Sequence, residues 1–147
     1  MRKKVVDAHY ARSPDYRKVL ESIEREGKCP FCPDNFKYHQ EKILRRSGDW
    51  LITKNSWSYK KAQHRLLIIC TVHKEHLAEL TVEDMAAVLR LAKWAVRKFA
   101  IAGGALAFRF GDTARTGATV CHLHAHLIVP KINKRTGRAE PVLFPIG

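Results

Sequence analysis

Runs of hydrophobic residues separated by polar turn residues predict most of the secondary structure of this chain. Apolar-rich segments predict strands over residues 42–46, 50–54, 64–70 and 105–110. The segment Ser47-Gly48-Asp49 predicts a hairpin between the first two strands. A further strand is expected over residues 120–130, where three histidines interrupt an otherwise apolar run.

Two helices are expected from their end signals. Ser13 is a good N-cap, Pro14 suits the first helical position and Gly27 suits the end, which predicts a helix to about Glu26. The segment from Thr81 to Asp84 resembles a capping box and begins a second, longer helix that ends at Gly103-Gly104. Its apolar stripe consists of Met85, Val88, Leu89, Ala92, Val96 and Phe99. Hairpin-connected strands and one long helix indicate an α+β fold with an antiparallel sheet.

The three histidines are the chemically most informative residues. Side chains alternate between the two faces of a strand, so His122, His124 and His126 are expected to share one face. The strand rise separates the outer two by roughly 13 Å, too far for all three to bind one metal ion easily. The arrangement favours a divided task, in which one imidazole attacks as a nucleophile while the others orient it or stabilise charge.

The composition indicates one domain in a reducing compartment. A chain of 147 residues is long enough for one core, and no repeat or low-complexity segment divides it. No targeting signal or membrane-spanning run is present in this sequence, so we expect no membrane partner. Four cysteines without a secretion signal predict a cytoplasmic protein whose thiols are free or bind metal.

A formal net charge of +13 predicts phosphorylated partners. The cations near the presumed site are Lys54, Lys60, Lys61, Arg65, Arg109 and Arg115. Nucleic acid is the larger possibility, and the basic run over residues 131–138 could contact a phosphate backbone. Such runs are more often simply solvated surface.

The histidine segment resembles the signature of the histidine triad (HIT) family, His-x-His-x-His followed by two apolar residues, here Leu127 and Ile128. Residues 63–69, 76–81 and 117–120 resemble other family segments, and the match covers about residues 29–130. The chain is thus expected to be a single HIT-like domain over 1–147, with an N-terminal helical extension (1–28) and a basic C-terminal tail (131–147). The resemblance implies an antiparallel sheet of about five strands, one long helix, an N-terminal helix and, commonly, a homodimer.

For the chemistry, the resemblance implies a covalent nucleotidyl-histidine formed by His124. His126 would bind the phosphate or assist the leaving group, and His64 would help to hold the phosphate from the adjacent strand. Thr119 takes the position of a hydroxyl that contacts the phosphoryl site, although an ordinary strand residue is equally expected there. Gly117 would permit close approach to phosphate, or serves as a plain turn glycine.

The Cys29-Pro-Phe-Cys32 pair has a spacing used for redox chemistry or for zinc. Redox chemistry is disfavoured because the pair follows a helix end instead of opening a helix. In similar family members a structural zinc is completed by two histidines, which would be His76 and His122 here. The segment before His76 is longer than the usual family link, so His73 is a competing ligand. Cys70 and Cys121 are expected to be buried thiols, and no organic cofactor is expected.

Other residues bear on the substrate. Arg109 stands where some relatives carry an asparagine and could exchange ribose or phosphate contacts. Asn55 is a candidate nucleotide contact, although a turn-forming asparagine is the more common case. Trp50, Trp57 and Tyr59 could stack on a base, but core packing is favoured for each.

The resemblance to the HIT family thus implies a nucleotidyl hydrolase or transferase. It would cleave an α-phosphate linkage, anhydride or phosphoramide, in a dinucleoside polyphosphate, phosphoramidate or adenylated compound. One alternative is an enzyme resembling aprataxin that removes adenylate from nucleic-acid ends, which the basic charge favours and the short tail disfavours. Another is a nucleotide-binding protein without catalysis.

Overall fold

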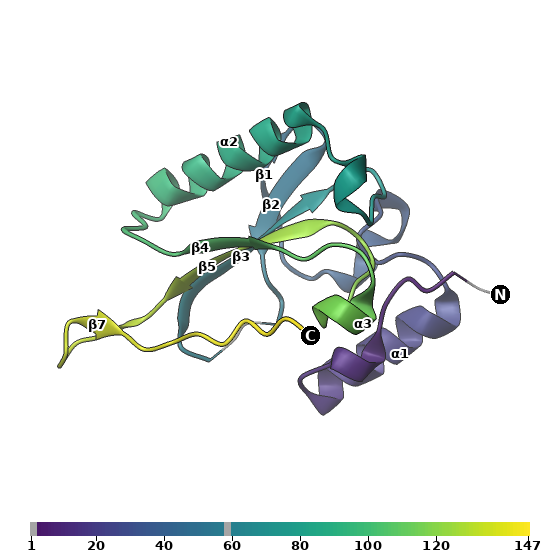
Figure 1. Ribbon diagram of the computed structural model, residues 1–147, viewed down its shortest axis with the longest axis horizontal. Helices are drawn as coiled ribbons and strands as arrows, with labels where there is room; N and C mark the ends of the chain where they lie inside the picture. The colour runs from purple at the N-terminus through teal and green to yellow at the C-terminus, as the bar shows by residue number, and fades with distance from the viewer. Residues whose placement is uncertain (1–2, 58–59) are drawn as a thin grey trace.

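A computed structural model describes residues 3–57 and 60–147 of the chain (Figure 1). The sheet strands are β1 (Ile43–Ser47), β2 (Trp50–Lys54), β3 (Ala62–Cys70), β4 (Ala105–Phe108) and β5 (His124–Pro130). The helices are α1 (Pro14–Glu26), α2 (Val82–Lys98) and the short α3 (Thr113–Thr116), and 3-10 turns cover Ala8–Tyr10, Pro33–Tyr38 and Leu77–Glu79. A small hairpin, β6 (Ile132–Asn133) and β7 (Arg138–Ala139), follows β5. The fold is α+β, as predicted.

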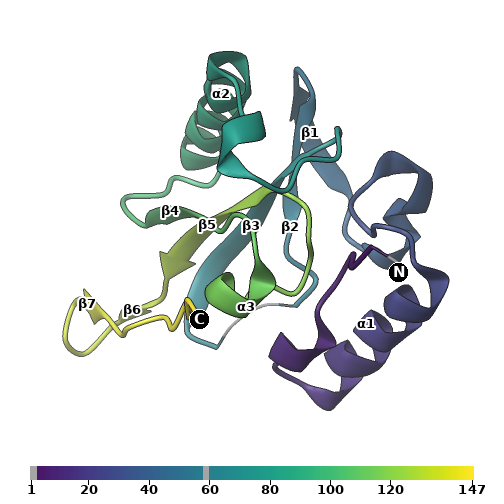
Figure 2. The same ribbon diagram turned by 45° about the vertical axis from the view of Figure 1, so that its right-hand side comes forward.

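The five main strands form one antiparallel sheet in the order β1-β2-β3-β5-β4. Helix α2 covers one face, and α1 and the chain after β7 lie on the other side (Figures 1 and 2). The core under α2 includes Trp50, Ile52, Leu66, Ile68, Ala125 and Leu127. Alternate residues of the same strands, Leu51, Leu67 and Ile69, face the opposite side. His124 and His126 pair with Ile69 and Leu67, which places the histidines on the α1 side.

Both long helices begin as their sequences predict. The Ser13 hydroxyl accepts from the Tyr16 N–H, and Gly27 ends α1 in the left-handed conformation at φ 71°. Thr81 and Asp84 form the capping box of α2. Helix α2 ends at Lys98, before the predicted Gly103-Gly104. No helix among the described residues is long and apolar enough to span a membrane.

The apolar stripe predicted for α2 divides into two surfaces. Val88 and Ala92 are buried against the sheet. Met85, Leu89 and Val96 are exposed on another side of the helix. The predicted apolar stripe is therefore only partly buried in the core.

The triad strand begins later than predicted. Strand β5 starts at His124, whereas Val120 makes an isolated bridge with Val6 and the next residues form a bend. The Leu123 N–H donates to the Lys74 carbonyl, 2.7 Å away, so this bend is tied to the segment after β3. His122 consequently lies outside the regular strand. Strand alternation therefore does not fix the direction of its side chain, as it does for His124 and His126.

Asp84 anchors the start of α2 to the sheet. Its carboxylate accepts from Trp50 Nε1 at 2.9 Å, from Lys74 Nζ at 2.6 Å and from the Thr81 N–H at 2.8 Å. Burial of the carboxyl acts to raise its pKa, but these hydrogen bonds outweigh it and hold the pKa well below the ordinary value. The charged form is thus the one that stabilises the fold.

We predict that Asp84→Asn lowers the free energy of unfolding by about 2 kcal/mol near pH 7, because each lost bond joined a charged group. Because the pKa of Asp84 is lower in the folded protein than in the unfolded chain, where it is about 4, the carboxylate stabilises the fold above about pH 4. This contribution is lost as the pH falls from the unfolded pKa toward the folded one. The difference between the two proteins should therefore shrink below about pH 4 in urea titrations. Glu83→Gln, in the same helical turn but exposed, is the control. A pH-independent difference would contradict the account.

Candidate active site and metal centre

His124 is held in one tautomer by the backbone carbonyl of His122. Its Nδ1 lies 2.6 Å from the His122 carbonyl oxygen. Because a carbonyl only accepts, Nδ1 carries the proton and Nε2 presents a lone pair. Burial, together with the nearby charges of Arg109 and Arg65, lowers the pKa of His124 to about 4, so the imidazole is neutral near pH 7. A neutral imidazole with a free Nε2 is the form that attacks as a nucleophile.

His126 is held in the opposite tautomer. Its Nδ1 lies 3.2 Å from Nη2 of Arg65, and a guanidinium only donates. The ring proton therefore sits on Nε2, which is buried and has no hydrogen-bond partner among the described residues. The two rings lie 4.8 Å apart between centroids. One ring thus offers a lone pair and its neighbour offers an N–H donor.

Arg65, and not His64, faces these two rings. His64 lies on the α2 side of the sheet and packs against Phe99 with ring centroids 5.2 Å apart. The prediction that His64 reaches the phosphate site is therefore corrected. Side chains alternate along β3, so His64 and Arg65 point to opposite faces of the sheet. The register is irregular between Ala62 and His64, so the sequence alone does not tell which of them lies on the triad face.

A cavity of about 560 Å³ opens beside His124 and His126. Its cations are Arg12, Lys60, Arg65 and Arg109, and its aromatic side chains include Tyr10, Tyr16, Phe31, Tyr38 and Trp57. Tyr16 of α1 stacks on Trp57 at 4.8 Å between centroids. The N-terminal segment thus forms a wall of the cavity.

Three of the predicted substrate contacts, Thr119, Asn55 and Gly117, lie at this cavity, but each is also used by the fold. The Thr119 hydroxyl lies 2.7 Å from the Tyr16 hydroxyl. Asn55 accepts from the Trp57 N–H at 3.0 Å, which is the turn that its sequence favours. Gly117 ends α3 at φ 67°, and a Cβ there would lie 2.6 Å from the Gly147 carbonyl oxygen. The close approach at Gly117 is therefore to the chain's own C-terminal segment.

Of the three predicted core aromatics, Trp50 is buried, as expected. Trp57 is 39% exposed and lines the cavity, so the core prediction was wrong for it. Tyr59 lies outside the described residues.

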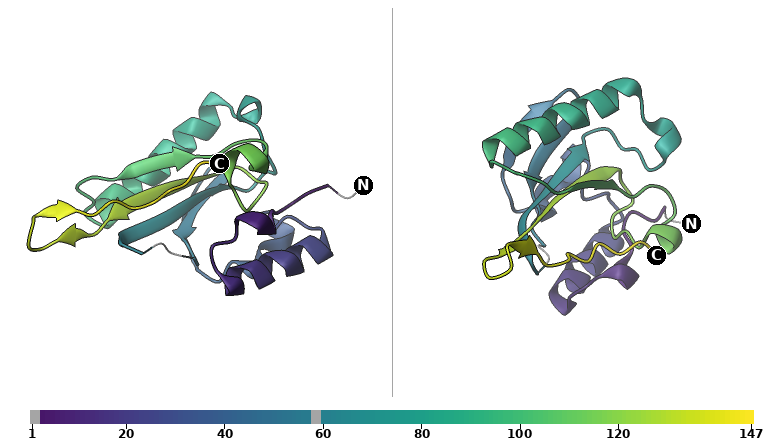
Figure 3. Two further views of the ribbon diagram at one scale, coloured as in Figure 1. Left: turned by 60° about the horizontal axis from the view of Figure 1, so that its bottom comes forward. Right: turned by 60° about the vertical axis from the view of Figure 1, so that its left-hand side comes forward.

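The C-terminal segment folds back over the triad. The β6–β7 hairpin reverses the chain, which then runs beside the sheet toward α3 (Figure 3). The Phe144 ring packs 5.0 Å from the His126 ring, and the Arg109 guanidinium lies 3.9 Å from the Phe144 centroid. Nη2 of Arg109 also donates to the Pro145 carbonyl. Burial in this contact lowers the pKa of Arg109.

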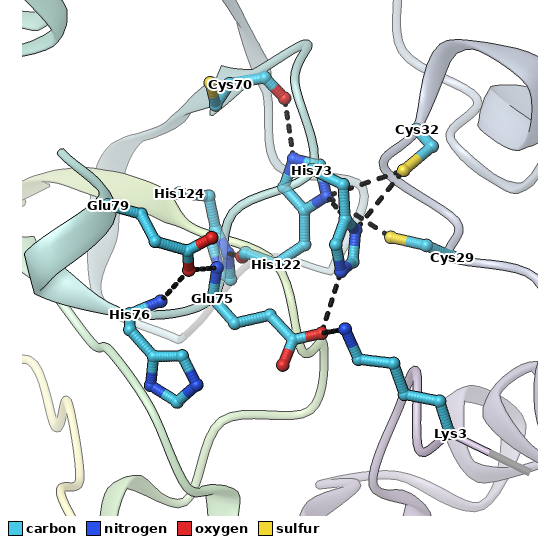
Figure 4. A network of polar contacts seen from close by, with 10 residues as sticks. All are labelled: Lys3, Cys29, Cys32, Cys70, His73, Glu75, His76, Glu79, His122 and His124. Atoms are coloured by element: carbon cyan, nitrogen blue, oxygen red, sulfur yellow. Dashed lines mark hydrogen bonds and ion pairs between the residues drawn. The ribbon is translucent and has the colours of Figure 1, made fainter.

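Four predicted or competing metal ligands converge at the other end of the triad (Figure 4). They are Cys29, Cys32, His73 and His122, and their ligand atoms lie within 4.8 Å of one another. Nδ1 of His122 lies 3.3 Å from Cys29 Sγ, 3.8 Å from Cys32 Sγ and 3.2 Å from His73 Nδ1. Tetrahedral zinc with these ligands requires separations of about 3.3 to 3.8 Å. The donor set fits such an ion.

The outer hydrogen bonds orient both imidazoles toward the cluster centre. Nε2 of His122 donates to the Cys70 carbonyl at 2.6 Å, and Nε2 of His73 lies 2.7 Å from a Glu75 carboxylate oxygen. Both protons are thereby placed on Nε2, so two Nδ1 lone pairs face each other. A cation between them removes that repulsion, which is an arrangement typical of a metal site.

His76 does not join the cluster. It is exposed and its Nδ1 faces Gly111. The prediction that His76 completes the set is corrected in favour of the competing ligand His73. Cys70 is buried and Cys121 is partly exposed, and neither contributes to this cluster.

Comparison with known proteins agrees with the geometry. The model of the HIT domain matches residues 47–133. The chain belongs to the HIT family. Among curated proteins, none matched the sequence.

Solved structures share the HIT fold at low sequence identity. A HIT family hydrolase from Legionella pneumophila Philadelphia 1 is 22% identical, with a TM-score of 0.57 over 75% of this chain and 100% of that one. A zinc-bound histidine triad family protein from Mycobacterium smegmatis is 21% identical, with a TM-score of 0.56 over 78% and 84%. The diadenosine triphosphate hydrolase of Plasmodium falciparum is 21% identical, with a TM-score of 0.51 over 62% of each chain.

Several residues of this HIT site were not predicted from the sequence. Arg65 was expected among the cations near the site, but its contact with His126 was not, because predicting it requires the register between β3 and β5. Arg12 and Tyr16 carry no local signal for a cavity wall, and Phe144 carries none for contact with the triad.

Proposed function

We propose that this HIT protein is a nucleotidyl hydrolase or transferase that acts through a covalent intermediate on His124. The observation that carries the proposal is the pair of opposed tautomers. His124 presents the Nε2 lone pair of a neutral imidazole, and His126 presents an Nε2–H donor beside it. This pairing suits nucleophilic attack on phosphorus with stabilisation of the developing charge.

In the first step, Nε2 of His124 attacks the α-phosphorus, and the bond from phosphorus to the leaving group breaks. The leaving group departs with the bonding electron pair. From an anhydride it leaves as a phosphate or nucleotide anion, and from a phosphoramide it leaves as an amine that takes the Nε2 proton of His126, which His126 recovers from water in the second step. The imidazolium keeps its Nδ1 proton, which is held by the His122 carbonyl. Water then attacks phosphorus, the nitrogen–phosphorus bond breaks, and the nucleoside monophosphate leaves as one water proton passes to solvent or to His126.

Three guanidinium groups support binding of the phosphates. Arg12, Arg65 and Arg109 all line the cavity, and Arg65 and Arg109 are largely buried. Burial lowers the pKa of Arg65, and the charges of Arg12 and Arg109 lower it further, so an anion among them relieves their mutual repulsion. We propose that Arg65 occupies the role the sequence assigned to His64, and that Thr119, Asn55 and Gly117 contact the nucleotide.

The substrate class we favour is a nucleotide with a second phosphate or nucleotide as leaving group. The structural likeness to a diadenosine triphosphate hydrolase supports this choice. To test the proposal, the protein is incubated with a dinucleoside polyphosphate, a nucleoside phosphoramidate and an adenylated oligonucleotide. Release of a nucleoside monophosphate is then measured by chromatography. Binding of nucleotides without release from any of the three would favour the non-catalytic alternative.

We propose that Cys29, Cys32, His73 and His122 bind one zinc ion with a structural role. Without a cation, burial and then the neighbouring Cys29 thiol raise the pKa of Cys32 to about 12, whereas zinc binds thiolates. A zinc-bound relative supports the choice of metal. Zinc at His122 would stiffen the bend whose carbonyl holds His124. Reduced thiol ligands also favour a cytoplasmic location.

We further propose a homodimer formed along the edge strand β4. Within the described part of the chain this strand pairs only with β5, and Leu106 on it is 43% exposed. Exposed apolar residues of α2 lie on the helix side away from β1, namely Val82, Met85, Leu89 and Val96. An unpaired edge beside an apolar surface is suited to a second copy of the chain.

Leu106→Lys is predicted to convert the dimer to a monomer, because it places two like charges at the centre of a symmetric contact. Light scattering at several protein concentrations measures the mass. Val72→Lys changes an equally exposed valine elsewhere and should leave the dimer intact. A wild-type protein with the mass of one chain would overturn the proposal.

A further inference from the structure

Helix α2 carries a basic stripe that neither the core nor the apolar edge uses. Arg90, Lys93 and Arg97 recur at helical spacing and are exposed, and Trp94 lies half-buried among them. The neighbouring strand β1 contributes Arg45 and Arg46. A groove of about 280 Å³ between β1 and α2 is lined by all six residues, and we call it the β1–α2 groove.

The groove is ordered and contains one sign of charge. Nε of Arg90 donates to the Ser47 hydroxyl at 2.9 Å, and the Arg45 guanidinium lies 5.7 Å from the Trp94 ring. No carboxylate belongs to the lining of the groove in the described part of the chain. Holding five cations together without an acidic neighbour raises the free energy through repulsion, which a bound polyanion would relieve.

Helix capping explains only part of this charge. Cations in the last turn of α2, such as Arg97, are stabilised by the helix dipole. Arg90 lies two turns earlier, and Arg45 and Arg46 belong to a strand, so the dipole does not account for them. Their arrangement around one groove therefore indicates a ligand.

We propose that the β1–α2 groove binds the phosphate backbone of a nucleic-acid strand, independently of its base sequence. From Arg90 to Arg97 the helix rises by about 10 Å, which matches about three phosphate-to-phosphate intervals along the axis of one strand. Charge alone provides contacts of this kind, and they carry no sequence information.

The groove is lined by residues of β1 and α2 and lies on the α2 face of the sheet, opposite to His124 and His126. A strand held in it does not enter the triad cavity of the same chain. The groove thus serves for attachment to nucleic acid and not for processing of its ends. This inference goes beyond the proposed nucleotidyl transfer, and each of the two can be tested without the other.

The test measures fluorescence anisotropy of a labelled 20-nucleotide DNA strand of mixed sequence, between about 50 and 200 mM salt. The test variant combines Arg45→Ala, Arg90→Ala and Arg97→Ala. The matched control combines Arg17→Ala, Lys18→Ala and Arg25→Ala on the exposed surface of α1, which removes the same net charge. Arg90→Gln with Arg97→Gln replaces the triple variant if that fails to fold.

We expect the groove variant to bind at least about tenfold more weakly and its salt slope to fall by about 2, as the loss of three phosphate contacts requires. The control should change affinity by less than about threefold, as expected for unspecific charge. Turnover of a small nucleotide substrate should be the same in all three proteins. Equal weakening in both variants, or equal competition by polyglutamate of the same charge, would overturn the inference.

Discussion

Replacing His124 by alanine should lower turnover of a nucleotide substrate by about 10⁴-fold or more, since the covalent route is removed. Nucleotide affinity should change little, because the three cavity arginines remain. His126→Ala should lower kcat by about 10²- to 10³-fold, since it removes one hydrogen-bond donor from the developing charge and leaves the nucleophile. Steady-state kinetics and equilibrium binding of a non-hydrolysable nucleotide separate these effects.

His64→Ala is the matched control for these variants. His64 is a neighbour of Arg65 in sequence but lies on the other face of the sheet. We expect turnover by His64→Ala to stay within about twofold of wild type. Turnover by Arg65→Ala should be lost, because Arg65 fixes the His126 tautomer. A large loss in His64→Ala with an active Arg65→Ala would show that the assignment of the two residues is inverted.

The second large effect is expected from the metal centre. The Cys29→Ser and His73→Ala proteins should purify without zinc. Because metal binding and folding are coupled, their free energy of unfolding should fall by several kcal/mol, and their unfolding temperature should fall with it. The nucleotidyl-transfer rate should also fall, since His122 would no longer be fixed and its carbonyl orients His124. Elemental analysis and thermal unfolding measure the first two effects.

His76→Ala is the control that distinguishes the two histidines. Its side chain is exposed and outside the cluster, so one zinc per chain should be retained with an unchanged unfolding temperature. Zinc lost from His76→Ala and kept by His73→Ala would restore the ligand set suggested by the family resemblance. Zinc retained by the Cys29→Ser protein would contradict the proposed metal site.

The sequence predicted the histidine pair and the helix ends because each depends on local spacing. The alternation of His124 and His126 on β5, and the caps at Ser13 and Thr81, require no knowledge of distant contacts. Arg65 was expected among the cations near the site, but its contact with His126 was missed because that contact depends on register. A slip of one residue turns every side chain of a strand to the other face, and this separates His64 from Arg65.

The metal ligands show a second limit. The estimate that three triad histidines cannot converge assumed one straight strand, whereas His122 lies in the bend before β5. His122 meets Cys29, which is 93 residues away in sequence, and the choice of His73 depends on how the chain turns after Cys70. Residues Tyr16 and Phe144 reach the cavity and the triad only through packing of the chain ends, for which no local pattern exists.

The most direct test of the account is the mass of the intact protein, quenched within seconds of mixing with a dinucleoside polyphosphate. We predict a fraction of wild-type protein heavier by one nucleotidyl group, with the adduct mapped to the peptide that contains His124. The adduct should be absent from His124→Ala and should accumulate on a longer timescale in His126→Ala. Turnover by wild-type protein with no adduct at any quench time, or an adduct that persists in His124→Ala, would contradict the proposed nucleophile.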